Sequence, residues 1–250
     1  MTTMPHAKES STLVLFVRSL LFSIGMTLST LIVVPLVMLS FPFPFEQRYR
    51  VSQRWSRFNM WWLKKTCGID CQISGLEHLP TGPTIVIAKH QSAWETMFLQ
   101  QLLPPLVWVV KRELLWVPFF GWALAILNPI SINRAAANAA IKQVLRQGRE
   151  QVSKGRWVLI FPEGTRTAPG VRGHYGVGGA MLAAYTGCPI LPVAHNAGEF
   201  WPRRGFLKRP GTIQLVFGPL VESTGRKAKE LNALVEEWIE GTMQRISNVA

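Results

Sequence analysis

Apolar and polar residues alternate along most of the chain in a way that predicts short strands separated by helices. Each expected strand is a run of apolar or β-branched residues bounded by turn-forming or charged residues. These runs cover residues 69–74, 84–88, 106–110, 129–132, 157–161, 190–194 and 212–217. Helical spacing predicts one helix from about residue 135 to 153 and another near the carboxyl terminus. Strands that alternate with helices indicate an α/β domain, with a mostly parallel or mixed sheet flanked by helices.

The amino-terminal segment has a different pattern, a long apolar run without charge. No charged residue occurs among the 27 residues from Ser19 to Phe45. As a helix they would extend about 40 Å, more than the roughly 30 Å hydrocarbon core of a bilayer. We therefore predict that residues 1–45 anchor the protein to a membrane through an apolar helix. Pro35 interrupts the run. A single span and a helical hairpin that enters and leaves one leaflet both remain open.

A basic amphipathic stretch, residues 46–68, follows the apolar run. Four apolar residues recur there at helical spacing: Val51, Trp55, Phe58 and Trp62. Tryptophans beside cations suit lipid headgroups, so an interfacial helix is predicted. A helix packed on the domain with a solvated basic face is the alternative. Because cations follow the apolar run densely, the remaining domain, residues 69–250, is expected on the cytoplasmic side.

Composition narrows the classes of partner. The chain of 250 residues carries 27 Lys and Arg against 14 Asp and Glu, a net charge of +13, with ten Trp. Nucleic-acid binders share this basicity but not the positive mean hydropathy of the chain. An anionic membrane surface fits better. The three cysteines form neither a disulfide framework nor a zinc pattern.

Candidate chemistry begins at His90, which follows the expected strand 84–88. The carboxyl end of a strand in an α/β sheet is where ligands usually bind. Glu95 lies five residues later, close enough on a following helix for its carboxylate to reach the imidazole. A histidine oriented by a carboxylate can take a proton from a hydroxyl near neutral pH. Ser92-x-x-Glu95 also matches a capping box, so a purely structural role for Glu95 stays open.

Two further strand ends carry arginine. Arg134 follows the strand 129–132 just before a helix, where it could hold an anion. The strand 157–161 leads into Pro162-Glu163-Gly164-Thr165-Arg166. That sequence combines a tight turn, a close backbone approach and a guanidinium suited to phosphate. Taken alone it could be only a polar turn.

Together these residues resemble a known family. His90-x4-Glu95, Arg134, Phe161-Pro-Glu-Gly-Thr-Arg166 and Leu191-Pro-Val-Ala194 are similar to the four ordered sequence blocks of the glycerolipid acyltransferases. The resemblance covers about residues 60–240 and is strongest to the bacterial 1-acyl-sn-glycerol-3-phosphate (lysophosphatidic acid) acyltransferases. Glu95 stands where that family usually has aspartate, and the Arg134 block lacks the usual glycine-led strand. These departures leave the acceptor lipid open.

The resemblance implies an acyl transfer from acyl-coenzyme A or acyl carrier protein to the free hydroxyl of 1-acyl-glycerol-3-phosphate, which forms phosphatidic acid. It implies His90 as general base and Glu95 as the group that fixes its tautomer. Arg166 and Arg134 would hold the acceptor phosphate, with Glu163, Gly164 and Thr165 shaping the turn beneath it. It implies no metal and no cofactor beyond the thioester co-substrate.

The expected partners are membrane lipids, lysophosphatidic acid and the acyl donor, and the expected location is the bacterial cytoplasmic (inner) membrane. The aromatic segment 111–122 is expected to line an acyl-chain groove, touch the bilayer or pack in the core. Three other functions remain open. They are acyl transfer to another lysophospholipid or a lyso-aminolipid, lipid hydrolysis, and lipid binding by an inactive membrane protein.

Overall fold

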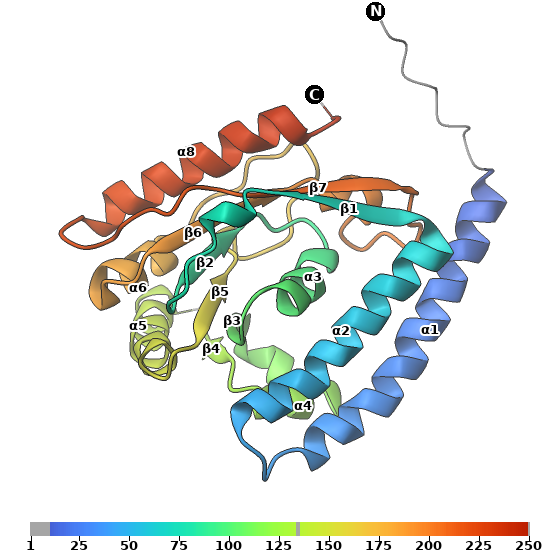
Figure 1. Cartoon of the computed structure of the whole chain (residues 1–250), viewed down its shortest axis with the longest axis horizontal. Helices are drawn as coiled ribbons and strands as arrows, with labels where there is room; N and C mark the ends of the chain where they lie inside the picture. Colours follow the sequence, from blue (N-terminus) through green and yellow to red (C-terminus); the bar gives the residue numbers. More distant parts are fainter. Residues whose placement is uncertain (1–10, 134–135, 250) are drawn as a thin grey trace, which may run out of the picture.

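A seven-stranded mixed sheet forms the centre of the fold in a computed structural model that describes residues 11–133 and 136–249 (Figure 1). The strands are β1 (Ile69–Ser74), β2 (Ile85–Ala88), β3 (Leu106–Lys111), β4 (Ile130–Ile132), β5 (Trp157–Ile160), β6 (Ile190–His195) and β7 (Gly211–Phe217). Their order across the sheet is β1-β7-β6-β2-β5-β3-β4. Neighbouring strands run parallel except for the antiparallel pair β6 and β7. The predicted mixed sheet is confirmed.

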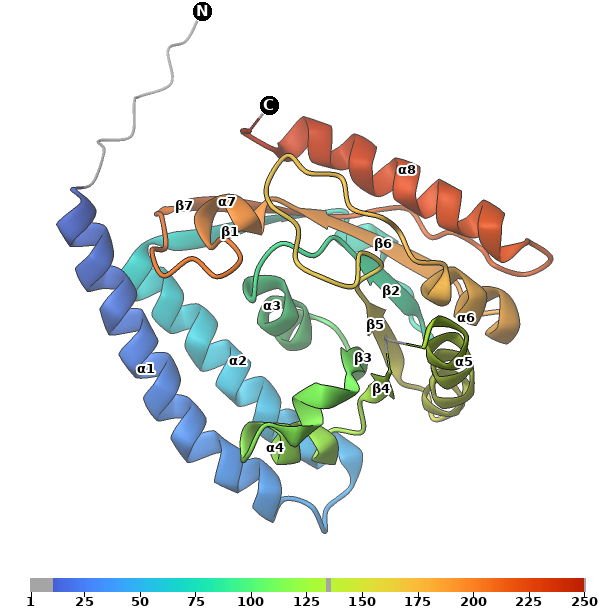
Figure 2. The ribbon, with the colours of Figure 1, turned by 180° about the vertical axis from the view of Figure 1, so that it is seen from behind.

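Helices cover both faces of the sheet (Figures 1 and 2). They are α1 (Thr12–Leu39), α2 (Phe45–Cys67), α3 (Trp94–Leu102), α4 (Phe120–Ile126), α5 (Ala137–Ser153), α6 (Gly178–Thr186), α7 (Ala197–Phe200) and α8 (Ala228–Ile246), with the 3₁₀ turns η1 (Leu76–His78) and η2 (Arg112–Trp116). Helices α5, α6 and α8 lie on one face. On the other, α3 is backed by α2 and then by α1.

The three central strands β2, β5 and β6 are buried along their whole length. Strands that are buried on both faces consist of continuous apolar residues, so the sequence pattern alone predicted their positions. Because these three strands are parallel, their carboxyl ends meet at one edge of the sheet. The ladder continues one step beyond β2, where Lys89 N–H donates to the Val193 carbonyl at 3.0 Å. This register places His90 at that edge.

Helices α1 and α2 form an antiparallel hairpin packed against the rest of the chain. Helix α1 continues through Pro35, and α2 ends at Cys67 and is capped by Gly68, whose left-handed φ of 68° suits glycine. The Trp62 indole N–H donates to the Leu21 carbonyl at 3.1 Å, and the Asn59 amide donates to Ser29 Oγ at 3.2 Å. Within the described residues, α1 is the one helix long and apolar enough to cross a membrane. Its outer side chains are exposed.

Candidate active site

His90 and Glu95 meet directly, as their spacing predicted. His90 lies in the loop between β2 and α3, and Glu95 lies in the first turn of α3. The imidazole Nδ1 and Glu95 Oε1 are 2.7 Å apart. The ring stacks on Phe161 with 4.1 Å between ring centroids, which fixes its plane. If Nδ1 carries the proton donated to the carboxylate, Nε2 is the nitrogen available to accept a proton.

The Glu95 carboxylate also holds the backbone that leads into α3. It is fully buried and accepts hydrogen bonds from the N–H groups of Gln91 and Ser92, both at 3.0 Å. The two interpretations of Glu95, cap and histidine partner, therefore describe one carboxylate that makes both sets of contacts. Ser92 Oγ accepts from Trp94 N–H at 3.2 Å, so only half of the capping box is formed.

A second histidine, His195 at the end of β6, lies beneath the first pair. Its Nε2–H donates to the Lys89 carbonyl at 2.8 Å, and its Nδ1 accepts from Ala197 N–H at 3.3 Å. Burial lowers the pKa of His195 below its ordinary value of 6.5, against the opposing effect of Glu95. These contacts fit a neutral imidazole whose N–H edge lies 3.9 Å from Glu95 Oε2.

The Glu95 carboxyl is ionised at neutral pH. Burial by itself would raise its pKa, but the interactions with His195 and His90 and the hydrogen bond from Ser92 N–H outweigh burial. The pKa therefore lies below its ordinary value of 4.5. A buried carboxylate beside His90 Nδ1 can stabilise an imidazolium formed at the same ring.

The loop after β5 holds the backbone of His90 through hydrogen bonds. Glu163 Oε2 accepts the His90 N–H at 2.7 Å, and Thr167 N–H donates to the His90 carbonyl at 2.8 Å. The Glu163 side chain has no exposed surface. Its carboxylate therefore faces the protein interior and positions His90, rather than presenting an oxygen to solvent.

The remaining predicted site residues lie at the same edge. Gly164 turns the chain with a left-handed φ of 65°, and Thr165 is exposed. Arg166 is half-buried, and its carbonyl accepts a hydrogen bond from the Arg203 guanidinium at 2.8 Å. Arg134 lies outside the described residues. The structure thus brings His90, Glu95 and the Glu163–Arg166 turn together.

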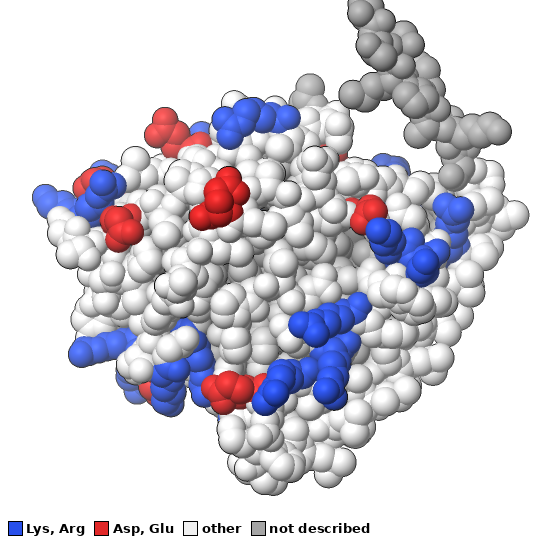
Figure 3. Space-filling view, viewed as in Figure 1, with Lys and Arg blue, Asp and Glu red and all other residues white. Residues whose placement is uncertain are grey.

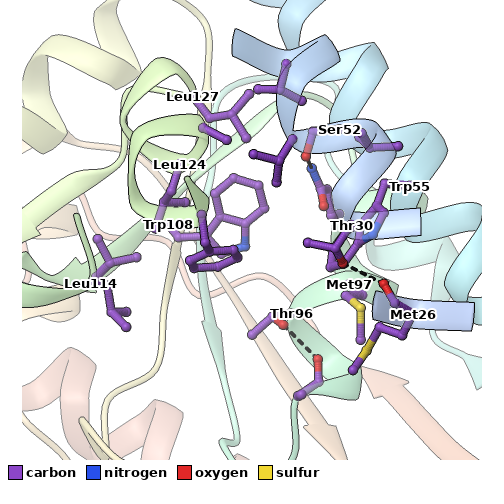
Figure 4. Close-up of a pocket in the computed structure, with 18 of the residues that line it drawn as sticks. Met26, Thr30, Ser52, Trp55, Thr96, Met97, Trp108, Leu114, Leu124 and Leu127 are labelled. Carbon is purple, nitrogen blue, oxygen red and sulfur yellow. Dashed lines mark hydrogen bonds between the residues drawn. The ribbon is translucent and has the colours of Figure 1, made fainter. Parts of the chain in front are cut away.

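An apolar cavity of about 480 Å³ opens beside this loop, between α3 and the α1–α2 hairpin (Figure 4). The labelled side chains come from α1, α2, α3, β3, η2, α4 and, for Leu127, the residue that follows α4. Ala93, between His90 and Glu95 in sequence, lines it, as does Arg166. Leu114 and Phe120 of the aromatic segment also line it, whereas Trp116 and Phe119 are exposed. A size of several hundred Å³ with an apolar lining suits a lipid-sized ligand.

Comparison with known proteins identifies the family. The acyltransferase family model matches residues 70–196. The chain is 50% identical over 210 residues to the 1-acyl-sn-glycerol-3-phosphate acyltransferase of Pseudomonas aeruginosa, and the match covers 82% of each chain. This chain belongs to the acyltransferase family. It is also 31% identical over 192 residues to the 1-acyl-sn-glycerol-3-phosphate acyltransferase of Saccharomyces cerevisiae, which covers 74% of this chain and 63% of that one.

A solved acyltransferase structure shares the fold. The crystal structure of the 1-acyl-sn-glycerophosphate (LPA) acyltransferase PlsC from Thermotoga maritima superposes with a TM-score of 0.74. That comparison covers 92% of this chain and 94% of the other, at 22% sequence identity. The coverage includes most of the chain outside residues 70–196, so the fold likeness extends beyond the family domain.

Several residues around this candidate site escaped the sequence analysis. Thr167 and His195 hydrogen-bond to the backbone of residues 89–90, and Lys89 pairs with Glu163, yet each lies in a stretch with the pattern of an ordinary strand or turn. A lysine at the end of a fully apolar strand was the one available signal, because lysine is rarely buried without a partner. The structure supplies that partner as Glu163.

Proposed function

We propose that this protein transfers an acyl chain from a thioester donor, acyl-coenzyme A or acyl carrier protein, to the free hydroxyl of 1-acyl-glycerol-3-phosphate. The observation that carries the proposal is the 2.7 Å contact between His90 Nδ1 and the buried Glu95 carboxylate. It prepares Nε2 to take a proton from a hydroxyl. The 50% identity to a bacterial 1-acyl-sn-glycerol-3-phosphate acyltransferase supports the acceptor.

In the proposed reaction the acceptor oxygen attacks the thioester carbonyl while its proton passes to His90 Nε2. Glu95 stabilises the resulting imidazolium through Nδ1. As the tetrahedral intermediate collapses, the carbon–sulfur bond breaks and the imidazolium returns the proton to the departing thiolate. The products are phosphatidic acid and a free thiol, so protons and electrons balance without an enzyme nucleophile.

Arg166 is proposed to hold the acceptor phosphate. Among the described residues that line the cavity, Arg166 is the cationic one. It immediately precedes Thr167, whose N–H donates to the His90 carbonyl. A guanidinium can bind two phosphate oxygens at once. The apolar cavity would take an acyl chain, with the phosphate at the part of its lining that Arg166 supplies. Arg134 stays a second candidate for the phosphate.

Lipid mass spectrometry of the purified full chain tests this proposal. With lysophosphatidic acid and either acyl donor, the parent should form phosphatidic acid and the His90→Ala variant should not. Product from a different lysolipid alone would reassign the acceptor. Free fatty acid in place of a diacyl product would indicate a hydrolase. Binding of lipid with no consumption of thioester would indicate an inactive lipid-binding protein.

We further propose that the α1–α2 hairpin enters one leaflet with α1 toward the hydrocarbon and the basic face of α2 at the headgroups, so that the catalytic domain stays on the cytoplasmic face of a bacterial inner membrane. Helix α1 is packed along α2, whose exposed Arg50, Arg54 and Arg57 are too costly to bury in hydrocarbon. In Figure 3 basic side chains gather along α2, while the flank formed by α1 is almost uncharged. A spanning α1 would have to separate from α2.

Cysteine labelling distinguishes the two arrangements. Ser11 caps the start of α1 and is exposed. A Ser11→Cys variant that lacks the three native cysteines should resist a membrane-impermeant maleimide added outside intact cells. Labelling from outside would show that α1 spans the membrane. Exposed Trp116 and Phe119 lie on the segment beside α1 and are proposed to enter the same leaflet.

A further inference from the structure

Beneath His90 lies a buried charged cluster that the proposed acyl-transfer steps do not use. Lys89, the residue before His90, has only 1% of its side chain exposed. Its ammonium lies 2.7 Å from Glu163 Oε1 and 2.8 Å from Glu240 Oε1, and it donates to the Val171 carbonyl at 3.2 Å. One lysine from the end of β2 therefore joins the loop after β5 to helix α8.

The cluster leads directly to the backbone of His90. Glu163 uses one oxygen for Lys89 and the other for the His90 N–H, at 2.7 Å each. At the far end, the Tyr175 hydroxyl donates to Glu240 Oε1 at 2.7 Å. Burial, followed by the bond to Glu240, raises the pKa of Tyr175, so the phenol stays protonated and donates. The contacts run from Tyr175 through Glu240, Lys89 and Glu163 to His90.

Burial makes this cluster sensitive to the loss of any member. Charges removed from water are stable only while they are paired and hydrogen-bonded, so an unpaired partner moves or changes its protonation. Glu163 Oε1 is shared between Lys89 and Thr167 Oγ1, which lies 3.1 Å away. Any shift of Lys89 therefore changes the contacts of Glu163 and, through its second oxygen, the position of His90.

We propose that Lys89, Glu240 and Tyr175 are positioning residues for the proposed acyl transfer, and that α8 is therefore part of the active-site apparatus. The matched family domain ends at residue 196, whereas Glu240 lies on α8 beyond it. The inference rests on the proposed function, because its kinetic readout is the rate of acyl transfer. It assigns to the carboxyl-terminal helix a role in catalysis that the family domain alone does not contain.

Helix α8 offers a matched control. Glu236 lies one helical turn before Glu240 and pairs with Arg172 at 2.6 Å, where the Arg172 side chain is 64% exposed. Glu236→Gln makes the same chemical change as Glu240→Gln at a surface pair, and such pairs contribute little. Both variants keep the size of the side chain. Tyr175→Phe removes only the hydroxyl that donates to Glu240.

The experiment measures kcat and both KM values for the full chain in detergent, together with hydrogen exchange of peptides that contain His90. Glu240→Gln should lower kcat about tenfold or more while both KM values stay within about twofold, since a displaced base slows chemistry without weakening binding. Peptides containing His90 should exchange faster than in the parent. Glu236→Gln should match the parent in both measurements.

An unchanged kcat for Glu240→Gln, or a raised KM with parental kcat, would overturn the inference. If Glu240→Gln does not fold, the same criteria apply to Tyr175→Phe, which removes a single oxygen. Failure of the proposed function is distinguishable from failure of this inference, because a parent that is inactive on every lysolipid refutes the acyl transfer. The exchange comparison then decides the positioning network by itself, and parental exchange in Glu240→Gln or Tyr175→Phe refutes it.

Discussion

Replacing Glu95 by glutamine separates the charge of this side chain from its shape. In the structure Glu95 Oε1 accepts from His90 Nδ1 and from the N–H groups of Gln91 and Ser92. A glutamine oxygen at the same place keeps these three acceptor contacts, and with them the tautomer of His90. The variant loses only the negative charge and the second acceptor oxygen.

The second oxygen sets the expected cost in stability. Glu95 Oε2 lies 3.1 Å from Ser92 N and 3.9 Å from His195 Nε2, and both nitrogens carry hydrogen. A glutamine NH₂ placed there faces these two donors where the carboxylate oxygen faced them as an acceptor. An unsatisfied buried polar group costs about 1–3 kcal/mol. At about 2–4 °C per kcal/mol for a protein of this size, Glu95→Gln should melt roughly 2–12 °C below the parent.

Glu95→Gln should slow catalysis strongly, whereas its cost in stability is modest. Without the carboxylate, no other described acidic side chain pairs with His90 Nδ1 to offset the positive charge that develops when Nε2 takes a proton. Impairment of a general base of this kind costs about 10²–10⁴ in rate. We therefore expect kcat of folded Glu95→Gln to fall by that factor while KM for lysophosphatidic acid changes little.

Initial rates and thermal melts in one detergent test this expectation. Ser92→Ala is the control, because it removes the Oγ contact to Trp94 N–H at a cost of about 0.5–1.5 kcal/mol without touching the imidazole. It should keep most activity. Glu95→Asp retains a carboxylate on a side chain one methylene shorter and should be partly active. Near-parental kcat in Glu95→Gln would refute the reasoning and leave Glu95 as a cap.

Three further expectations concern single side chains. Arg166→Ala should raise the acceptor KM roughly ten- to a hundredfold and leave donor KM unchanged, because a charged contact to phosphate contributes about 1.5–3 kcal/mol. A change in donor KM alone would reassign Arg166 to the thioester carrier. His90→Ala should stay folded and membrane-bound with kcat reduced about 10²–10⁴-fold, as melts, sedimentation and rates would show. His195 has a folded-state pKa below 6.5, so its contribution to stability is complete above pH 6.5 and is lost as pH falls toward the folded value. Melts from neutral to acidic pH should therefore show a smaller decline for His195→Gln than for the parent, and parallel curves would contradict this.

Local sequence patterns alone located every described strand to within one residue of its place in the structure. The fully buried strands β2, β5 and β6 are continuous apolar runs, and that burial is recorded in the residues themselves. The His90–Glu95 contact was also predictable, because it spans a single strand-to-helix turn. The uncharged run from Ser19 to Phe45 indicated an apolar helix for the same local reason.

Only the tertiary structure decided which side chains surround that pair. Lys89 meets Glu240, and Glu95 lies beside His195, across long stretches of chain that no periodicity links. Glu163 was expected to shape a turn beneath a phosphate, and the fold shows that its carboxylate is buried against Lys89 and the His90 N–H. Such contacts depend on the register of parallel strands and the packing of α8, which are set by the burial of the whole core rather than by any one segment.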